Sequence, residues 1–306
     1  MPDHAKETIR SLILDAGACA VGFAEAAPVD DADMVLYDRW IAAGSHGEMA
    51  YLDRYHDVRR DPRLLLDGAL TVISCAFDYR PSRRHPLFAD YALGRDYHEV
   101  IRERLTPVTD EIRCLFGGET RICVDTAPIR ERYWAARAGV GRIGLNGTLI
   151  VDGIGSKVFL AEIIWTGSLA PDDSRLGESC MRCGACLRAC PGRALHGDGS
   201  LDARSCNSYL TIEYRGELPG DLHLSGRIYG CDICQDVCPH NRVEGVTTIA
   251  EFSPSDALMR LDADALSAMT HDAYRSIFRH SAIRRAKLPH LLRNLLRNLL
   301  RAHNNR

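Results

Sequence analysis

The feature that most constrains this chain is a set of eight cysteines crowded between residues 180 and 238. The first run reads Cys180-x2-Cys183-x2-Cys186-x3-Cys190 and is followed by Pro191. In a bacterial-type iron–sulfur run of this spacing, three close thiolates bind one cubane [4Fe–4S] cluster and the fourth reaches the other cluster of a pair. The spacing therefore predicts two clusters rather than one.

A second cysteine run completes the ligand count. Cys231-x2-Cys234-x3-Cys238 ends in Pro239 and lacks the first cysteine of the full pattern, which Cys206 can supply. By the crossover rule the first cluster takes Cys180, Cys183, Cys186 and Cys238, and the second takes Cys190, Cys206, Cys231 and Cys234. Zinc is the alternative, because CxxC pairs also suit tetrahedral sites, but a third cysteine after two residues and the Cys-Pro endings fit zinc ribbons poorly.

Composition places the chain among ordinary globular proteins, with 306 residues, 46% hydrophobic and 26% charged. No stretch approaches the ~18 apolar residues of a membrane span, and the N-terminus lacks the pattern of a signal peptide. Twelve cysteines without an export signal indicate a reducing compartment, so we expect a cytoplasmic protein with no membrane partner. The four scattered cysteines, Cys19, Cys75, Cys114 and Cys123, are expected to serve packing.

Apolar periodicity predicts alternating helices and strands in the first half of the chain. We expect helices over 4–18, 37–43, 97–115 and 130–138, and strands over 19–26, 70–77, 121–128 and 157–167. This alternation suggests an α/β domain over residues 1–170, within an overall α+β or α/β fold class. A ferredoxin-like module over 171–245 and a short helical, basic segment over 246–306 follow.

A glycine-rich loop precedes the cysteines. Gly139, Gly141 and Gly144 have the GxGxxG spacing of a dinucleotide fingerprint, but they follow a predicted helix and precede a strand, the reverse of the Rossmann order. A nicotinamide site is therefore weakly supported. The loop can bring bare backbone close to a bulky ligand, or it can simply be a turn.

Asp125 ends an apolar strand beside a turn that contains Pro128. An acid in this position is often a helix cap, and it can also serve as a general acid if an apolar site raises its pKa. His98, in the segment Gly-Arg-Asp-Tyr-His, is the one histidine expected near a site, with an ordinary half-buried histidine as the alternative.

Several motifs together resemble the epoxyqueuosine reductase family. They are the stretch VDTAPIRERYWAARAGVGRIGLNGTLI, both cysteine runs, ARSCNSYLTIE around Cys206 and GCDICQDVCP around Cys231. The likeness extends upstream through HGEMAYL, DPRLL and YALGRDYH, and downstream through SIFRHSAIRR. It therefore covers most of the chain.

The resemblance implies an oxidoreductase that uses two [4Fe–4S] clusters and base-off cobalamin to reduce epoxyqueuosine to queuosine at the wobble position of tRNA. It implies that Asp125 donates a proton as a carboxylic acid kept neutral in an apolar pocket. It also assigns cobalamin contacts to Asp125, Gly141, Arg142, Ile143, Gly144, Asn146, Thr148, Leu149, Ser208, Cys231 and Asp232. The electron donor is left unidentified.

Two departures from the family pattern are visible. Where the family usually reads GWIGK, this chain has Arg142 and Leu145 in place of the aromatic residue and the lysine. Longer family members also carry a C-terminal helical-repeat domain that grips tRNA, whereas we expect this sequence to have room for only a few of those helices. These departures lend weight to one rival, a corrinoid reductase of a small molecule such as a halogenated compound. A second rival is a ferredoxin-like electron carrier, against which the N-terminal domain over 1–170 argues, because a carrier needs only the cluster module.

The C-terminal segment is basic, with nine Lys and Arg and no acid from Ala273 onward. Its leucines follow i, i+3, i+4 spacing over 287–301, and Arg293, Arg297 and Arg301 line the opposite face. The pattern indicates an amphipathic helix that docks its leucines on the body. We expect its arginines to contact the phosphates of the anticodon region of tRNA, with simple solvation or a membrane surface as alternatives.

Overall fold

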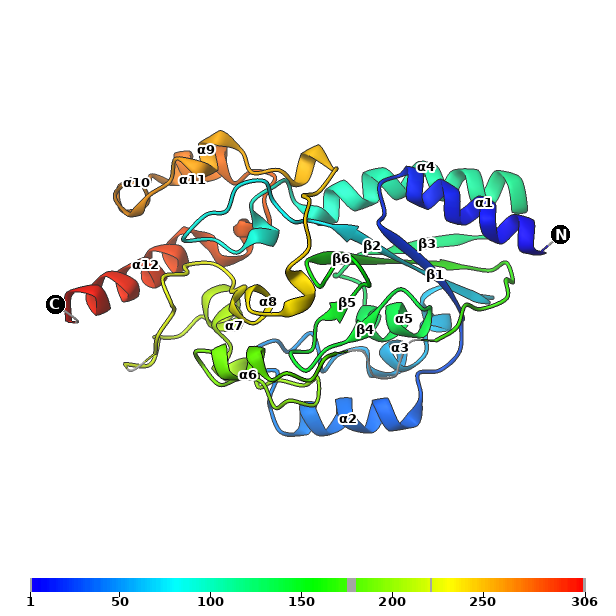
Figure 1. Cartoon of the computed structure of the whole chain (residues 1–306), viewed down its shortest axis with the longest axis horizontal. Helices are drawn as coiled ribbons and strands as arrows, with labels where there is room; N and C mark the ends of the chain where they lie inside the picture. Colours follow the sequence, from blue (N-terminus) through cyan, green and yellow to red (C-terminus); the bar gives the residue numbers. More distant parts are fainter. Residues whose placement is uncertain (1, 175–179, 221, 305–306) are drawn as a thin grey trace.

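A four-stranded sheet lies at the centre of the computed structural model (Figure 1), which describes residues 2–174, 180–220 and 222–304. Its strands are β1 (Ala20–Glu25), β2 (Thr71–Asp78), β3 (Thr120–Cys123) and β6 (Val158–Trp165), in the order β1-β2-β6-β3. Every neighbouring pair is antiparallel. The expected mixture of helices and strands is confirmed, but the sheet is of the α+β type, because alternation along the sequence predicts the order of elements and not the direction of their strands.

Both faces of the sheet are covered, which explains why the central strands read as continuous apolar runs. Helices α1 (Pro2–Asp15) and α4 (Tyr97–Phe116) pack on one face against Ile73 and Phe77 of β2. Helix α5 (Glu131–Arg137) packs on the other face against Val72. Alternate residues of each strand thus enter different cores.

The second predicted helix begins earlier than expected. Helix α2 runs over Asp31–Ala42 rather than 37–43, with acidic residues in its first turn that favour the helix N-terminus. Short helices complete this half of the chain: α3 (His56–Arg60), η1 (Pro62–Leu65) and η2 (Asp90–Ala92). The glycine-rich loop contains a small hairpin of β4 (Arg142–Ile143) and β5 (Leu149–Ile150).

The cysteine-rich region consists of single helical turns joined by irregular chain. These turns are α6 (Ala185–Ala189), η3 (Ala203–Ser205), α7 (Asn207–Ile212), α8 (Ile233–Asp236) and η4 (Pro239–Asn241). Gly184 lies between Cys183 and α6 in a left-handed conformation, with φ of 69°, which glycine adopts without strain. This turn lets successive cysteines point toward a common centre.

Helices follow to the end of the described chain. They are η5 (Ala250–Phe252), α9 (Asp256–Met259), α10 (Ala263–Ser267), α11 (His271–Ile277), η6 (Ala282–Ala286) and α12 (Lys287–Asn304). Their apolar core includes Phe88 from the first half, Tyr229 from the cysteine region and Phe278 and Leu291 from the helices. Because this core joins all three expected segments, the boundaries at 170 and 245 stay predictions. Among the described helices, none combines the length and apolarity needed to cross a membrane.

Candidate functional site

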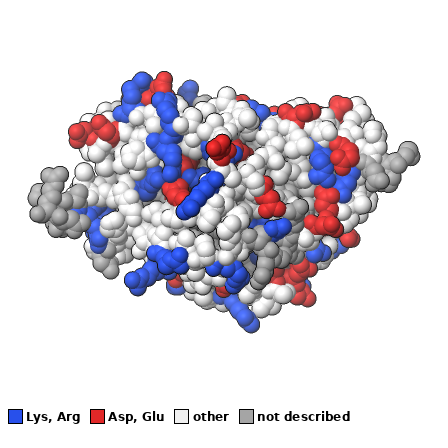
Figure 2. Space-filling view, in the orientation of Figure 1, with Lys and Arg blue, Asp and Glu red and all other residues white. Residues whose placement is uncertain are grey.

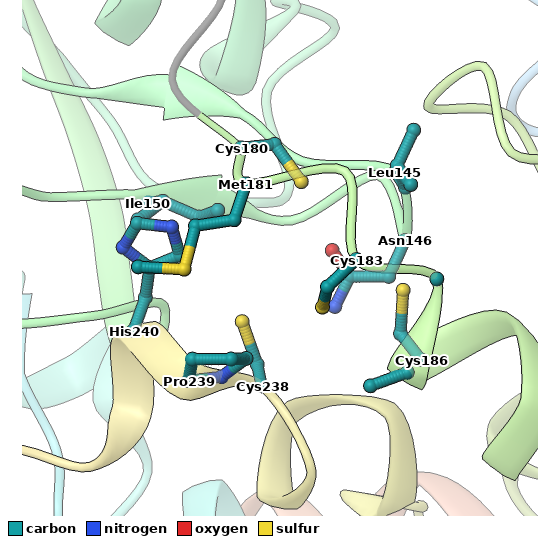
Figure 3. A pocket seen from close by; sticks show the side chains of 12 residues that line it. Leu145, Asn146, Ile150, Cys180, Met181, Cys183, Cys186, Cys238, Pro239 and His240 are labelled. Carbon is teal, nitrogen blue, oxygen red and sulfur yellow. The ribbon is translucent and has the colours of Figure 1, made fainter.

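Four cysteines from two chain segments line one pocket. Cys180, Cys183 and Cys186 come from the loop before α6 and from α6 itself, and Cys238 comes from the turn after α8 (Figure 3). Their sulfur atoms face a common space in the close-up, and Cys183 is exposed to solvent. These are the four cysteines assigned by sequence to the first cluster, and the donor set includes no carboxylate.

The other four predicted ligands also lie near one another. Burial, together with the neighbouring Cys231, Cys206 and Cys190, raises the pKa of the Cys234 thiol to about 12. Backbone N–H groups of Tyr209 and Ser208 face the Cys206 thiol and act in the opposite direction. As placed, no group of three or more described His, Cys, Asp or Glu side chains could hold a single metal ion. The two sulfur sets match the chemistry of iron–sulfur ligation, in which each cluster is held by four thiolates.

A chain of three side chains forms a second centre, apart from the cysteines. Asp96 caps the N-terminus of α4 and accepts a hydrogen bond of 2.6 Å from His98 Nδ1. The other ring nitrogen, Nε2, lies 3.0 Å from Oδ2 of Asp125. His98 therefore lies beside Asp125, and that the two form the reactive site stays a prediction. Two carboxylates thus orient one imidazole, with one on each ring nitrogen.

The backbone at Asp125 is strained. Its φ is +52°, a left-handed conformation that residues other than glycine seldom adopt. The backbone N–H of Asp125 donates to the carboxylate of Glu131 at the start of α5. The helix-cap alternative is wrong, because α5 begins only at Glu131 and its N-cap position is occupied by Arg130. The turn instead aims the carboxylate at His98.

The electrostatic interactions in this centre favour a protonated His98 beside an ionised Asp125. Burial disfavours the charged imidazole, but the hydrogen bonds to Asp125 and Asp96 outweigh it and raise the pKa of His98 to about 9. Burial likewise opposes ionisation of Asp125, yet His98 lowers the pKa of that carboxyl below its usual value. The expectation of a neutral Asp125 is therefore wrong: its side chain is 57% exposed and pairs with a cation.

Residues from distant segments complete this surface. The Arg285 guanidinium, from η6, lies 5.6 Å from the centre of the Tyr51 ring and also lowers the pKa of Asp125. It makes a bidentate ion pair with Glu213, at 2.9 Å for each contact. Tyr97 stacks on His98 with ring centres 4.0 Å apart. Tyrosine, arginine and the Asp96–His98–Asp125 triad thus share one face.

Sequence reasoning missed several of these residues. Asp96 precedes a predicted helix and is two residues from His98, a capping signal that could have identified it. Glu131 and Glu162 gave no such signal. Burial and the negative charge of Asp125 raise the pKa of Glu131 to about 8. Burial also raises the pKa of Glu162, which is fully buried on β6, well above its usual value.

The glycines of the predicted loop serve internal packing. A Cβ atom on Gly141 would lie 2.5 Å from the carbonyl oxygen of Ile150 across the β4–β5 hairpin. A Cβ on Gly139 would lie 2.6 Å from the carbonyl oxygen of Asp173. The turn alternative therefore explains these glycines without a ligand.

The other loop residues predicted to contact cobalamin have different surroundings. Arg142 lies 3.6 Å from Asp152, and Ile143 is 39% exposed. Leu149 is buried in a hydrophobic core. Gly144 and Thr148 flank Asn146, whose side chain lines the pocket of the first sulfur set. The loop thus reaches the cysteines.

The predicted cobalamin contacts near Cys231 also have hydrogen-bond partners within the protein. Asp232 is 1% exposed and accepts a hydrogen bond of 2.8 Å from the backbone N–H of Asp90. Ser208, on α7, accepts a hydrogen bond from the Thr211 hydroxyl at its carbonyl oxygen. Cys231 follows Tyr229 and Gly230, and the Tyr229 ring lies 6.1 Å from that of Tyr91. The tyrosine two residues before Cys231 is thus part of a buried core.

The arginines of α12 have protein partners. Arg293 donates to the carbonyl oxygens of Leu210, Tyr214 and Gly216, at 2.9, 3.0 and 2.6 Å. Arg297 donates to the carbonyl oxygens of Pro219 and Leu222. These two arginines hold the cysteine region to the helix. Within the basic segment, η6 acts on Asp125, because the charge of its Arg285 lowers the pKa of that carboxyl.

Comparison with known proteins supports both halves of the site. A family model described as "4Fe-4S double cluster binding domain" matches residues 179–241, and one described as "Epoxyqueuosine reductase QueG, DUF1730" matches residues 59–126. The curated epoxyqueuosine reductase of Leadbetterella byssophila is 37% identical, over 96% of this chain and 98% of its own. That of Escherichia coli K12 is also 37% identical, over 84% of this chain and 71% of its own.

Solved structures agree. An epoxyqueuosine reductase crystallised with an epoxyqueuosine-modified tRNA-Tyr stem loop aligns with a TM-score of 0.87 and 29% identity, over 98% of this chain and 82% of its own. The Bacillus subtilis enzyme, solved with its catalytic loop swung out of the active site, aligns with a TM-score of 0.85 and 28% identity, over the same shares of each chain. The likeness thus extends over nearly the whole chain.

Proposed function

Since the chain belongs to the epoxyqueuosine reductase family, we propose that it reduces epoxyqueuosine to queuosine in tRNA. The observation that carries this proposal is the Asp96–His98–Asp125 triad, which holds a proton on an exposed, strained loop. A simple electron carrier has no use for such a centre. No contact in the described residues favours a small-molecule substrate over tRNA.

The chain's own residues match the cofactors that this reaction needs. The two sulfur sets would hold two [4Fe–4S] clusters, which the double-cluster family model supports. We propose, from the resemblance, that Asp125, the Cys231–Asp232 turn, the β4–β5 loop and Ser208 would hold cobalamin. When bound, it would supply low-valent cobalt for the two-electron reduction of the epoxide. The exposure of Asp125 is consistent with a group that meets a bound molecule.

The triad supplies a proton at the point where oxygen leaves. Reduction of an epoxide to an alkene consumes two electrons and two protons and releases water. Oδ2 of Asp125, 3.0 Å from Nε2 of His98, is placed to pass the imidazolium proton to the departing oxygen. Asp96 holds the ring from its other side, as a carboxylate does in a catalytic triad. Asp125 is thus proposed as the catalytic acid and His98 as its proton source.

We propose that tRNA approaches the face that carries η6. Figure 2 shows Lys and Arg side chains over the C-terminal half of the molecule, while acidic side chains are more numerous around the N-terminal helices. Arg285 lies beside Tyr51 and close enough to Asp125 to lower its pKa. Arginine pairs with phosphate and stacks on rings, so this residue is suited to a nucleotide near the acid.

The decisive experiment is anaerobic reconstitution. The protein is loaded with iron, sulfide and cobalamin, its loading is confirmed by absorbance, and it is given a low-potential reductant and epoxyqueuosine-containing tRNA. Mass spectrometry of the nucleosides is expected to show loss of one oxygen from the modified base. An unchanged nucleoside, from protein that holds both clusters and the corrin, would overturn the proposed substrate.

A further inference from the structure

Asn146 is a buried polar residue in the loop that joins β4 to β5. The loop is closed by hydrogen bonds from Gly144 N–H to the Thr148 carbonyl, 2.9 Å, and from Gly147 N–H to the Gly144 carbonyl, 2.9 Å. Asn146 sits at its turn and is only 6% exposed. A polar amide in this position needs partners inside the protein, because water does not reach it.

The orientation of the amide is fixed by Thr148. The backbone N–H of Thr148, which can only donate, lies 3.3 Å from Asn146 Oδ1, and the Thr148 hydroxyl donates to the same oxygen at 2.9 Å. The oxygen is thereby identified and satisfied. The NH2 group must point the other way, and its nitrogen is buried without an acceptor among the described residues.

The space that this NH2 group faces is lined by sulfur. Asn146 lines the pocket of Cys180, Cys183, Cys186 and Cys238, and Figure 3 shows its amide pointing into that pocket beside Cys183. Asn146 therefore directs a donor that is unpaired among the described residues at the first sulfur set.

We propose that Asn146 donates its amide hydrogens to the sulfur of the first [4Fe–4S] site, held by Cys180, Cys183, Cys186 and Cys238, and thereby raises its reduction potential. A reduced cluster carries one more negative charge, so a fixed N–H donor stabilises it more than the oxidised form and raises the potential. Asn146 is thus a positioning residue for electron transfer through the first cluster. The inference rests on the cluster sites alone and holds whichever substrate the protein reduces.

The test is a redox titration of the loaded protein followed by electron paramagnetic resonance. Asn146→Leu, which keeps the size of the side chain but removes both donors, is expected to lower the potential of the first cluster. The expected change is about tenfold in the reduction equilibrium, ~59 mV for one electron. Asn146→Asp, of the same shape with an added negative charge, is expected to lower it further. No substrate enters this measurement, so its failure is distinct from failure of the proposed function.

Thr148 provides a matched pair of variants. Thr148→Val removes the hydroxyl that orients the amide and is expected to shift the potential in the same direction by less, while Thr148→Ser keeps the hydroxyl and the native potential. Should Asn146→Leu not retain iron, this pair decides. Potentials equal to those of the unaltered protein in Asn146→Leu or, in that case, in Thr148→Val would overturn the proposal.

Discussion

The sulfur sites and the Asp96–His98–Asp125 triad differ in almost every physical respect. The sulfur sites are built from short turns in one region, where thiols from neighbouring segments converge. The triad joins the start of α4 to a loop after β3, carries charge and is open to solvent. The first arrangement suits the holding of electrons and the second the handling of protons. We therefore expect variants to affect one function and spare the other.

The largest loss is expected from the cysteine that crosses between the runs. Cys238→Ser should remove the first cluster and about half of the bound iron, and abolish turnover, because the ligand set of that site is broken. Cys190→Ser should remove the second cluster instead. Iron analysis with electron paramagnetic resonance distinguishes the two. Loss of the second cluster from Cys238→Ser and of the first from Cys190→Ser would contradict the crossover.

Asp125→Asn should reduce turnover by ~10²–10⁴-fold while leaving iron and sulfide content unchanged, because a positioned acid contributes rate enhancement of this size. Single-turnover assays on fully loaded protein measure it. Asparagine also tolerates a left-handed backbone, so the loop should keep its shape. Full activity would remove Asp125 from the mechanism.

His98 should set the alkaline limit of activity. Its pKa of about 9 means that the imidazole holds its proton at neutral pH and loses it as the pH rises through about 9. Activity should fall over that interval, and His98→Gln should be slower, on the order of 10²-fold, without this alkaline limb. Because the folded pKa is raised, stability from this pair should be full below about 6.5 and lost toward pH 9. A pH–rate profile and thermal unfolding at each pH test both statements.

The smallest effects are expected from substitution of two arginines in the basic segment. One substitution should affect tRNA binding and the other should affect stability. Arg285→Ala is expected to weaken tRNA binding and to reduce its salt dependence by a slope of ~1. Arg293→Ala should leave that slope unchanged but lower the free energy of unfolding by about 2–3 kcal/mol, since three carbonyl oxygens lose a charged donor. Binding measured at several salt concentrations, with denaturant unfolding, distinguishes them. If tRNA binding by Arg285→Ala and by Arg293→Ala had the same salt-dependence slope, η6 would not contact phosphate.

Local spacing explains which parts of this molecule could be predicted. The spacing within each cysteine run involves only a few residues, so the run could be recognised from the sequence. The apolar strand expected over 70–77 and the helix expected over 97–115 could be predicted for the same reason. The strand directions were not, because pairing is decided between distant segments. The neutral state of Asp125 was wrongly expected for the same reason: His98 is 27 residues away in the chain. The arginines of α12 have helical spacing whether they face phosphate or carbonyl oxygens.

The position of Cys238 has a consequence for the order of events during synthesis. Under the proposed ligand sets, the first cluster waits for Cys238 and the second for Cys234, so neither can be completed until the second cysteine run has been synthesised. By then all strands of the central sheet have been made. The helices that pack around Tyr229 have yet to emerge. Both ligand sets are therefore completed only after every strand of the central sheet has been made, and before the helices that close the core around Tyr229.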